Sequence, residues 1–359
     1  MAKQFNIDLN LGDNCNFRCS YCFEREHSAA RVLTDDVLER FISLVKMATE
    51  TGSTVNINFW GGEPLLHIKH VRRVLDEFTG NERVSFLMYT NGWYVLDNSD
   101  LLLKARETYG KRLVIQVSHD FLPGDLSHRV NPSSTPVETE ERVLNAIRFL
   151  DDNDFEYSVK TTGSFEDLED NFCEQFVNFH NFRLTLKKRD QIGYGYTPDT
   201  CATRAVNREK FEAQLLKLLK FFAANKLKNP NFRWFNNENQ RLSCGAGKHS
   251  FAVDVNGNTK YCHGCFYHNE ANDDTLKIAN IFDDNALFLA EHNYVAENSL
   301  NLPDGKCKTC DALVCFRCNA MNCNGDVKHW ADPCVDNVCE VYKIASKYIE
   351  AFRVMSKKW

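Results

Sequence analysis

The chain has 359 residues and a formal net charge of -6 at pH 7, with 43% hydrophobic and 26% charged residues. This length can bury a sizeable core and predicts one large domain with a smaller one. The mildly acidic balance argues against a nucleic-acid partner, which would favour a basic surface. Residues 1–6 lack the apolar core of a signal peptide, and no stretch of about eighteen apolar residues occurs. We therefore expect a cytoplasmic protein without a membrane span.

Alternating strand and helix patterns fill the chain up to residue 224. Residues 5–11 alternate apolar and polar side chains, which predicts a first strand. Residues 35–51 follow a Thr34 cap and repeat apolar side chains at helical spacing, which predicts a first helix. Further strands are expected at 55–60, 84–89, 113–117, 157–161 and 183–186, and further helices at 68–78, 101–108, 139–150, 172–179 and 209–224. The alternation predicts a parallel α/β sheet, either open and doubly wound or curved into a partial barrel.

Three of the fifteen cysteines lie on the loop after the first strand, as Cys15, Cys19 and Cys22 in C-x3-C-x2-C spacing. Reducing compartments keep cysteines from forming a disulfide framework, so we expect metal ligation. Three thiolates can hold three corners of a four-iron cubane and leave the fourth iron open, whereas a closed cluster takes four cysteines. A structural zinc site also takes four protein ligands, and the next cysteine along the chain is Cys173.

Polar and glycine-rich segments follow the next three predicted strands. They are Gly61-Gly62-Glu63-Pro64, Thr90-Asn91-Gly92 and Ser118-His119-Asp120. Ligands of parallel α/β folds bind at the carboxyl ends of the strands, so we expect these segments to line a site. Paired glycines let a backbone approach a ligand closely. Taken alone, each segment is also typical of a turn or a helix cap.

A second field of ten cysteines spans residues 244–339. Before most of them, residues 251–261 have the pattern of a β-hairpin with a two-residue Asn256-Gly257 turn. This field predicts either a cluster-binding module or a pair of zinc knuckles. The tail keeps helical spacing from residue 338 to 355. We expect a barrel domain at 1–225, a linker at 226–243, a cysteine-rich domain at 244–339 and a terminal helix at 340–359.

The cysteine loop, with Tyr21 before its last cysteine, resembles the radical S-adenosylmethionine (radical SAM) superfamily. The second field resembles the SPASM extension of that superfamily and the related anaerobic sulfatase maturases. It departs from their pattern, because C-x2-C-x4-C-x2-C stands where they have C-x2-C-x5-C-x3-C. The resemblance implies a partial (β/α)6 TIM-like barrel, a C-terminal cysteine-rich hairpin and knuckle domain, and a terminal helix.

The resemblance also implies one 4Fe-4S cluster that binds SAM and two auxiliary 4Fe-4S clusters. The implied ligands of the first cluster are Cys15, Cys19 and Cys22. Those of the inner auxiliary cluster are Cys244, Cys262 and Cys318, with either Cys265 or an open iron at the fourth position. Those of the outer cluster are Cys307, Cys310, Cys315 and either Cys334 or Cys339. Cys323 is an additional cysteine beside them.

The residues implied to contact SAM are Tyr21, Gly61, Gly62, Glu63, Pro64, Asn91 and Ser118. Two implied catalytic residues are Asp120, near the substrate, and His263. His263 is interpreted either as a proton acceptor or as a hydrogen-bond donor to a cluster sulfur. Sulfatase maturases carry an aspartate at this position, which argues against the same activity here. Arg129 is interpreted as a solvated surface arginine rather than as a partner of the methionyl carboxylate.

The implied reaction is reductive cleavage of SAM to a 5′-deoxyadenosyl radical, which abstracts a hydrogen from a side chain of a peptide or protein. The side chain is then oxidised or crosslinked, as in the maturation of ribosomal peptides. Expected partners are the peptide, a reductant such as flavodoxin or ferredoxin, and a separate leader-binding protein, because the first strand starts near residue 5. The alternatives are a small-molecule alcohol or amine dehydrogenase and a non-catalytic iron-sulfur redox or scaffold protein.

Overall fold

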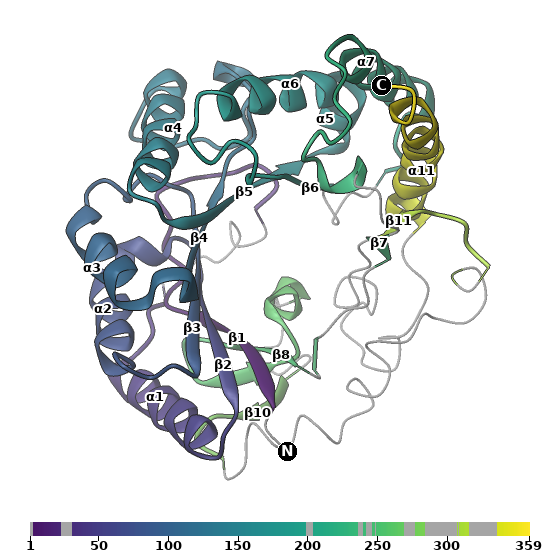
Figure 1. The fold of residues 1–359 in the computed structure, drawn as a ribbon. Coiled ribbons are helices and arrows are strands. Elements are labelled where there is room, and N and C mark those ends of the chain that lie inside the picture. The colour runs from purple at the N-terminus through teal and green to yellow at the C-terminus, as the bar shows by residue number, and fades with distance from the viewer. Residues whose placement is uncertain are drawn as a thin grey trace.

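The protein folds around a curved sheet in which six parallel strands follow one another in chain order (Figure 1). The computed structural model describes residues 3–22, 31–198, 204–235, 240–241, 246–247, 249–268, 277–283, 307, 309–315 and 336–359. The six strands are β1 (Gln4–Asn10), β2 (Thr54–Trp60), β3 (Val84–Thr90), β4 (Leu113–Ser118), β5 (Glu156–Gly163) and β6 (Tyr194–Pro198). Their order and helical cover confirm the predicted partial (β/α)6 barrel.

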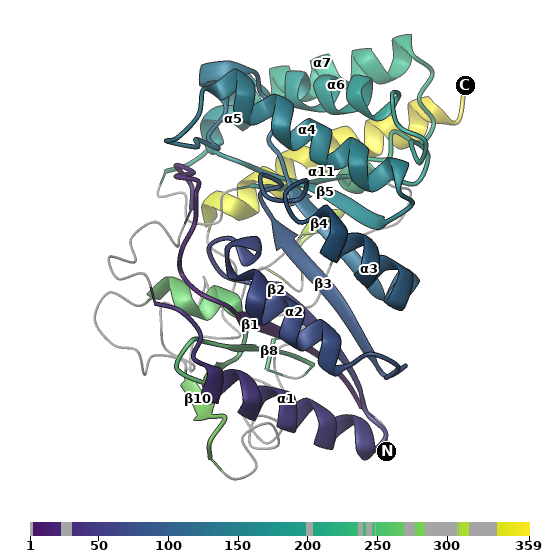
Figure 2. The same cartoon turned by 90° about the vertical axis from the view of Figure 1, so that its left-hand side faces the viewer.

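Helices cover the outer face of this sheet (Figure 2). They are α1 (Asp35–Glu50), α2 (Ile68–Glu77), α3 (Ser99–Tyr109), α4 (Pro136–Asp152), α5 (Phe165–Asp170), α6 (Phe172–Arg183) and α7 (Arg208–Ala224), with short 3-10 helices η2 (Pro64–His67), η3 (Gly110–Arg112) and η4 (Gly124–Leu126). Local sequence sets where they begin. Thr34 caps α1 as predicted, and Thr135 and Glu138 form a capping box on α4.

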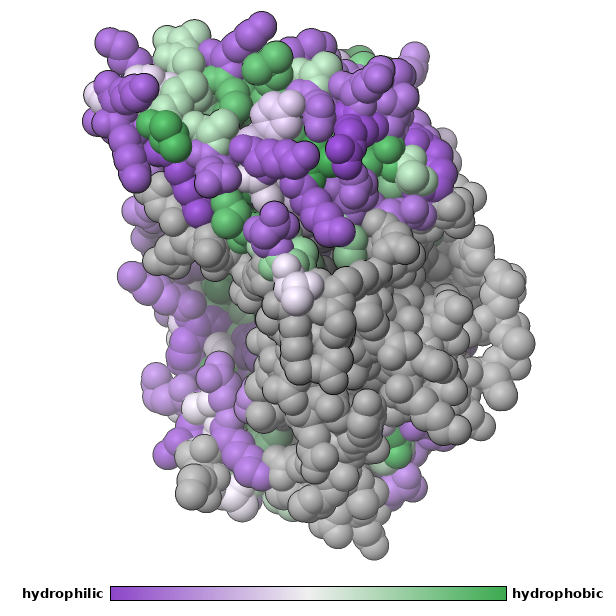
Figure 3. All heavy atoms as spheres, turned by 90° about the vertical axis from the view of Figure 1, so that its right-hand side faces the viewer, coloured by the Kyte–Doolittle hydropathy of each residue, from purple (hydrophilic) through white to green (hydrophobic). Residues whose placement is uncertain are grey.

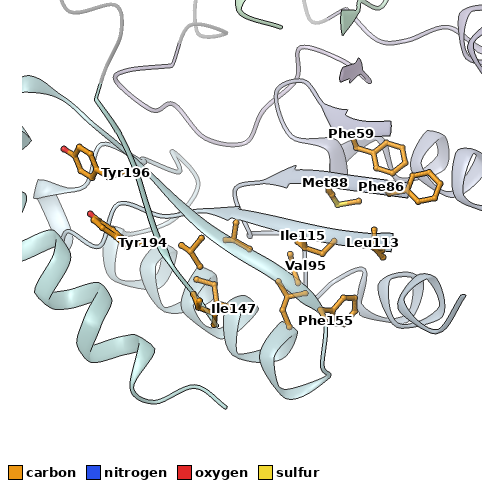
Figure 4. Close-up of a cluster of buried hydrophobic side chains, with 14 of the residues drawn as sticks. Phe59, Phe86, Met88, Val95, Leu113, Ile115, Ile147, Phe155, Tyr194 and Tyr196 are labelled. Carbon is orange, nitrogen blue, oxygen red and sulfur yellow. The ribbon is translucent and has the colours of Figure 1, made fainter. Parts of the chain in front are cut away.

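The two faces of the sheet differ in polarity, because side chains alternate along each strand. The outward set is apolar and buried under the helices, and includes Phe59, Phe86, Met88, Leu113 and Ile115 (Figure 4). The other face of β1 and β2 carries polar side chains that bond to one another. Asn56 donates to Asn58 (2.6 Å), and Asn58 donates to Asp8 (2.7 Å). The interior of the partial barrel is therefore polar.

The prediction of a sixth strand at 183–186 was wrong. Helix α6 runs to Arg183, and the chain then forms turns whose amides at Lys187 and Lys188 donate to the carboxylate of Asp151 (2.6 and 3.0 Å). The true sixth strand is the segment Tyr194–Pro198, whose glycine and proline weaken its strand pattern. Helix α5 was also missed.

A hairpin from the C-terminal part of the chain extends the same sheet. Its strands are β8 (Ser250–Val253) and β9 (Asn258–Lys260), followed by β10 (Lys277–Asn280), and β8 pairs in parallel with β1. The hairpin confirms the prediction, but its turn differs from the expected one. Of the Asn256-Gly257 pair only Gly257 has a positive φ, of 81°. The carboxylate of Asp254 closes the turn by accepting from the amides of Asn256 (2.9 Å) and Asn258 (2.8 Å).

The expected terminal helix is present as α11 (Asp336–Ser356) and packs against α7. Aromatic residues of the predicted linker join the two. Phe232 and Phe235 are buried, and Phe235 in the 3-10 helix η5 (Arg233–Phe235) lies 5.5 Å from the ring of Phe352 on α11. A two-residue strand β7 (Gln240–Arg241) pairs with β11 (Val314–Cys315). The segment after α7 therefore forms part of the core.

The described surface seen in Figure 3 is mainly hydrophilic, with apolar side chains scattered over it. None of the helices within the described residues combines the length and the apolar character that crossing a membrane requires.

Candidate active site

The cysteine loop follows β1 and is held from two sides by backbone hydrogen bonds. On one side, the amides of Gly62 and Glu63 donate to the carbonyls of Gly12 (2.9 Å) and Asn14 (2.8 Å). On the other side, the amide of Arg18 donates to the carbonyl of Val130 (2.7 Å), and the amide of Ser20 donates to the carbonyl of His128 (3.1 Å). These contacts fix the three cysteines at the carboxyl ends of the strands.

The paired glycines after β2 are required by this close contact. A Cβ atom on Gly62 would lie 2.2 Å from the carbonyl oxygen of Asn14. One on Gly61 would lie 2.4 Å from that of Gly12, and Gly61 has a φ of 133° that disfavours other residues. The glycines therefore let the loop after β2 pass directly against the cysteine loop, and both also line the cavity described below.

Glu63 ties the ends of β2 and β3 together. Its side chain is fully buried and accepts from the Leu65 amide (3.1 Å), the Thr90 hydroxyl (2.8 Å) and the Asn91 amide (2.8 Å). Burial raises the pKa of this carboxyl above its ordinary value. Glu63 caps η2, whose first residue is Pro64. Neither Glu63 nor Pro64 is among the residues that line the cavity described below.

One cavity of about 330 Å³ opens at the carboxyl ends of the strands. Its wall brings together nine predicted site residues: Cys15, Cys19, Tyr21, Cys22, Gly61, Gly62, Asn91, Ser118 and His263. The remaining wall is Phe17, Trp60, Tyr89, Thr90, Gln116, Arg129, Lys160, Thr162, Thr197 and Pro198. Most of these come from the polar inner face of the barrel. Residues far apart in the sequence thus meet where the fold predicts a ligand.

Three thiols on one loop are the donor type that iron-sulfur clusters take. All three line this cavity, and Cys15 Sγ accepts from the amide of Phe17 (3.4 Å) and the side chain of Asn91 (3.8 Å). Burial raises the pKa of Cys15 and of Cys19 to about 11. Metal ligation requires the thiolate, so bound metal must supply the charge that offsets this burial. Amide donors to a ligating sulfur are the contacts that adjust a cluster's reduction potential.

Tyr21, Asp120 and Arg129 form a hydrogen-bonded group beside the cysteines. The Tyr21 hydroxyl donates to Asp120 Oδ1 (2.8 Å) and accepts from Arg129 Nη1 (3.0 Å). The guanidinium of Arg129 lies 5.6 Å from the ring centre of Phe17 and lines the cavity, so the prediction of a solvated arginine was wrong. Asp120 is 1% exposed and not among the cavity-lining residues, and burial raises its pKa to about 6.

His263 reaches the cavity from the C-terminal hairpin, at the start of the 3-10 helix η6 (His263–His268). Its Nδ1 lies 2.6 Å from Oδ2 of Asp8, and its ring lies 5.7 Å from that of Trp60. Sequence reasoning missed Asp8. The signal was its place in the alternating first strand, between Asn6 and Asn10, where an acidic residue faces the inside of the barrel.

The auxiliary-cluster cysteines are only partly described. Cys244, Cys318, Cys323 and Cys334 lie outside the described residues. Cys262 Sγ lies 3.8 Å from Cys265 Sγ, which places Cys265 within reach of any metal centre that Cys262 holds. The other described members are half-buried: Cys307, Cys310, Cys315 and Cys339.

Comparison with known proteins assigns the N-terminal part of the chain to a family. Residues 9–171 match the family described as the Radical SAM superfamily. The chain therefore carries a radical SAM domain. The fold is similar to that of anSMEcpe with bound AdoMet, which superposes with a TM-score of 0.71 at 16% identity, covering 99% of this chain and 96% of that one. SuiB from Streptococcus suis, bound to S-adenosylmethionine, superposes with a TM-score of 0.59 at 13% identity, covering 89% of this chain and 74% of SuiB.

Two relatives match parts of the sequence. The radical SAM cyclopropyl synthase TigE of Paramaledivibacter caminithermalis is 26% identical over 157 residues, which are 40% of this chain and 32% of TigE. A GTP 3′,8-cyclase of Microcystis aeruginosa is 36% identical over 127 residues, 34% of this chain and 37% of the cyclase. The alignments thus span about a third of the length of each relative.

Proposed function

We propose that this protein is a radical SAM enzyme that modifies a side chain of a peptide or protein. The observation that carries the proposal is the meeting of three cysteines, the paired glycines, Asn91, Ser118 and His263 around one cavity. When bound there, a 4Fe-4S cluster and SAM supply a 5′-deoxyadenosyl radical that removes a hydrogen from the substrate. A small reductant protein such as flavodoxin or ferredoxin supplies the electron.

The chain's own residues bind the cluster and SAM and orient them. Cys15, Cys19 and Cys22 hold the cluster. The backbone at Gly61 and Gly62 and the side chains of Asn91 and Ser118 bind SAM. Glu63 acts indirectly, because its hydrogen bonds hold Asn91 in place. Asp120 likewise holds Tyr21, which lines the cavity.

His263 serves as the proton acceptor of this reaction. Oxidation of the substrate radical releases a proton and an electron. A positioned histidine can take the proton, and an auxiliary iron-sulfur cluster, when bound, would take the electron. The contact of Nδ1 with Asp8 fixes the ring and leaves Nε2 for the substrate. Asp8 is itself held by Asn58, so the pair is positioned by the sheet.

A peptide substrate is supported by the neighbours of this fold. anSMEcpe was crystallised with a Cp18Cys peptide, and SuiB with its precursor peptide SuiA. The polar inner wall of the cavity suits a peptide backbone, which needs hydrogen-bond partners when it leaves water. A separate leader-binding protein delivers the peptide to the barrel.

Two auxiliary 4Fe-4S clusters complete the proposal, with Cys262, Cys265, Cys307, Cys310, Cys315 and Cys339 among the candidate ligands. Anaerobically purified protein should then hold about twelve irons per chain. About four irons with two zinc ions would contradict the auxiliary clusters and leave the first cluster intact.

The decisive experiment measures SAM cleavage and hydrogen transfer separately. Reconstituted, reduced protein should convert SAM to 5′-deoxyadenosine, and alanine replacement of all three loop cysteines should abolish this. With a uniformly deuterated candidate peptide, the 5′-deoxyadenosine should gain deuterium and the peptide should change mass. His263→Asn should keep SAM cleavage and lose the peptide product. Absence of SAM cleavage in iron-loaded protein would refute the proposal that this is a radical SAM enzyme. Cleavage of SAM without deuterium transfer from any tested peptide would refute the proposal that its substrate is a peptide.

A further inference from the structure

A second cavity, of about 230 Å³, lies beside the cysteine loop. It is bounded by the segment after β4, the short helix η4 and the start of α4. Its lining is Phe17, His119, Leu122, Gly124, Asp125, Ser127, Arg129, Val130, Asn131, Ser134, Pro136, Thr139, Glu140 and Val143. Only Phe17 and Arg129 also line the first cavity. Its volume is below the range of about 300–1,000 Å³ typical of drug-sized ligands, so it suits a smaller molecule.

His119 presents a hydrogen-bond donor to this cavity. Its side chain is 6% exposed, and its Nδ1 accepts from the amide of Phe121 (3.0 Å). Burial lowers the pKa of His119 to about 3, so the ring is neutral and its proton is on Nε2. Nε2 has no protein hydrogen-bond partner within the described part of the chain.

Two further polar atoms on the same wall lack partners among the described residues. They are Nε of Arg129 and Oγ1 of Thr139, both buried. Buried polar atoms are nearly always hydrogen-bonded, so these two unsatisfied atoms, beside the Nε2 donor of His119 on the same cavity, indicate a missing ligand group. An acceptor that carries negative charge satisfies His119 and Arg129 together, as a carboxylate does.

The rest of the wall defines the remainder of the ligand. Apolar side chains come from Phe17, Leu122, Val130, Pro136 and Val143. Two acidic residues lie on the side formed by η4 and α4, where Asp125 is exposed and Glu140 half-buried. An ammonium group complements these carboxylates.

We infer that this cavity binds a small zwitterionic amino acid with an apolar side chain. The carboxylate accepts from His119, Arg129 and the hydroxyl of Thr139, and the ammonium faces Asp125 and Glu140. Arg129 also donates to Tyr21 beside the cluster cysteines, so this one side chain connects the bound amino acid with the wall of the first cavity. This inference stands apart from the proposed function, since it needs neither cluster nor radical chemistry.

The test uses the full chain with its histidines labelled with ¹⁵N, titrated with L-phenylalanine up to about 10 mM. We expect a shift of the His119 Nε2 resonance and saturable binding by calorimetry. 3-Phenylpropionate, which lacks the ammonium, should bind more weakly, and phenethylamine, which lacks the carboxylate, weaker still. No shift with any probe would mean that the cavity holds water only and would overturn the inference, as would equal binding of phenethylamine and L-phenylalanine.

Two variants locate the binding. His119→Asn keeps an oxygen where Nδ1 accepts from the Phe121 amide and removes the donor to the cavity. It should weaken L-phenylalanine binding at least about fivefold, the effect of one lost hydrogen bond. Thr139→Val, of equal shape, should also weaken it, whereas Thr108→Val on α3 should not. Unchanged binding in both cavity variants would place the amino acid elsewhere and refute the site.

Discussion

Replacing Asp120 by asparagine should change how the stability of the protein depends on pH. Asp120 is 1% exposed and accepts one hydrogen bond, from Tyr21, while its other oxygen has no partner among the described residues. Burial raises its pKa from 3.8 to about 6, and Arg129 offsets only part of this. At about 1.4 kcal/mol per pKa unit, the difference corresponds to about 3 kcal/mol.

The sign follows from linkage between proton binding and folding. Because the folded-state pKa is raised, the contribution of Asp120 to stability is fully present below pH 3.8 and is lost as the pH rises through about 6. Asparagine resembles the protonated carboxyl at every pH. The free energy of unfolding of Asp120→Asn, relative to wild type, should therefore be near zero at about pH 4 and rise by about 3 kcal/mol towards pH 8.

Urea unfolding of the metal-free protein under reducing conditions measures this difference across the pH range. Equal slopes of unfolding free energy against urea in the two proteins would show that both expose the same surface. If wild type and variant change in parallel from about pH 4 to pH 8, the carboxyl is not the buried, poorly solvated group described here.

Three further changes test the site and the core. Gly62→Ala should displace the cysteine loop, since its Cβ would lie 2.2 Å from the carbonyl of Asn14; iron content after reconstitution should fall sharply, while Gly193→Ala, with 3.4 Å to its nearest neighbour, should retain iron. Ser118→Ala should weaken SAM binding about two- to tenfold, the effect of one hydrogen bond, in calorimetry of the reconstituted protein; unchanged affinity would remove Ser118 from the SAM site. Phe352→Ala on the terminal helix should lower the free energy of unfolding by about 3–5 kcal/mol, and a loss below about 1 kcal/mol would show that this helix is not part of the core.

The elements with strong periodicity were predictable from sequence. Helix α1 has a capping threonine and a regular apolar stripe, and five of the six strands alternate or run apolar between clear boundaries. The cysteine spacing and the glycine pair likewise indicated which loops meet, because parallel strands place their carboxyl ends at one edge. Strand β6 was missed because its glycine and proline weaken the strand pattern. The segment 183–186, which was predicted as a strand, instead forms the end of α6 and the turns that follow it.

Contacts between distant segments could not be read from local patterns. Arg129 was expected in solvent, yet it lies over Phe17 and binds Tyr21, which only the folded chain brings near. The pairing of Asp8 with His263 joins residues 255 positions apart. Local sequence carries no information on which strand edge receives the C-terminal hairpin, and that docking decides which acid the histidine meets.

The parallel pairing of β8 with β1 means that β1 is not an edge strand, and the sheet continues through β8 and β9 to β10. An unpaired edge strand is a template for association with other chains, and here the chain itself covers it. A fragment ending after α7 would lose this cover and the histidine together. The C-terminal hairpin thus both covers the edge of β1 and supplies His263 to the cavity, so truncation would remove the two together.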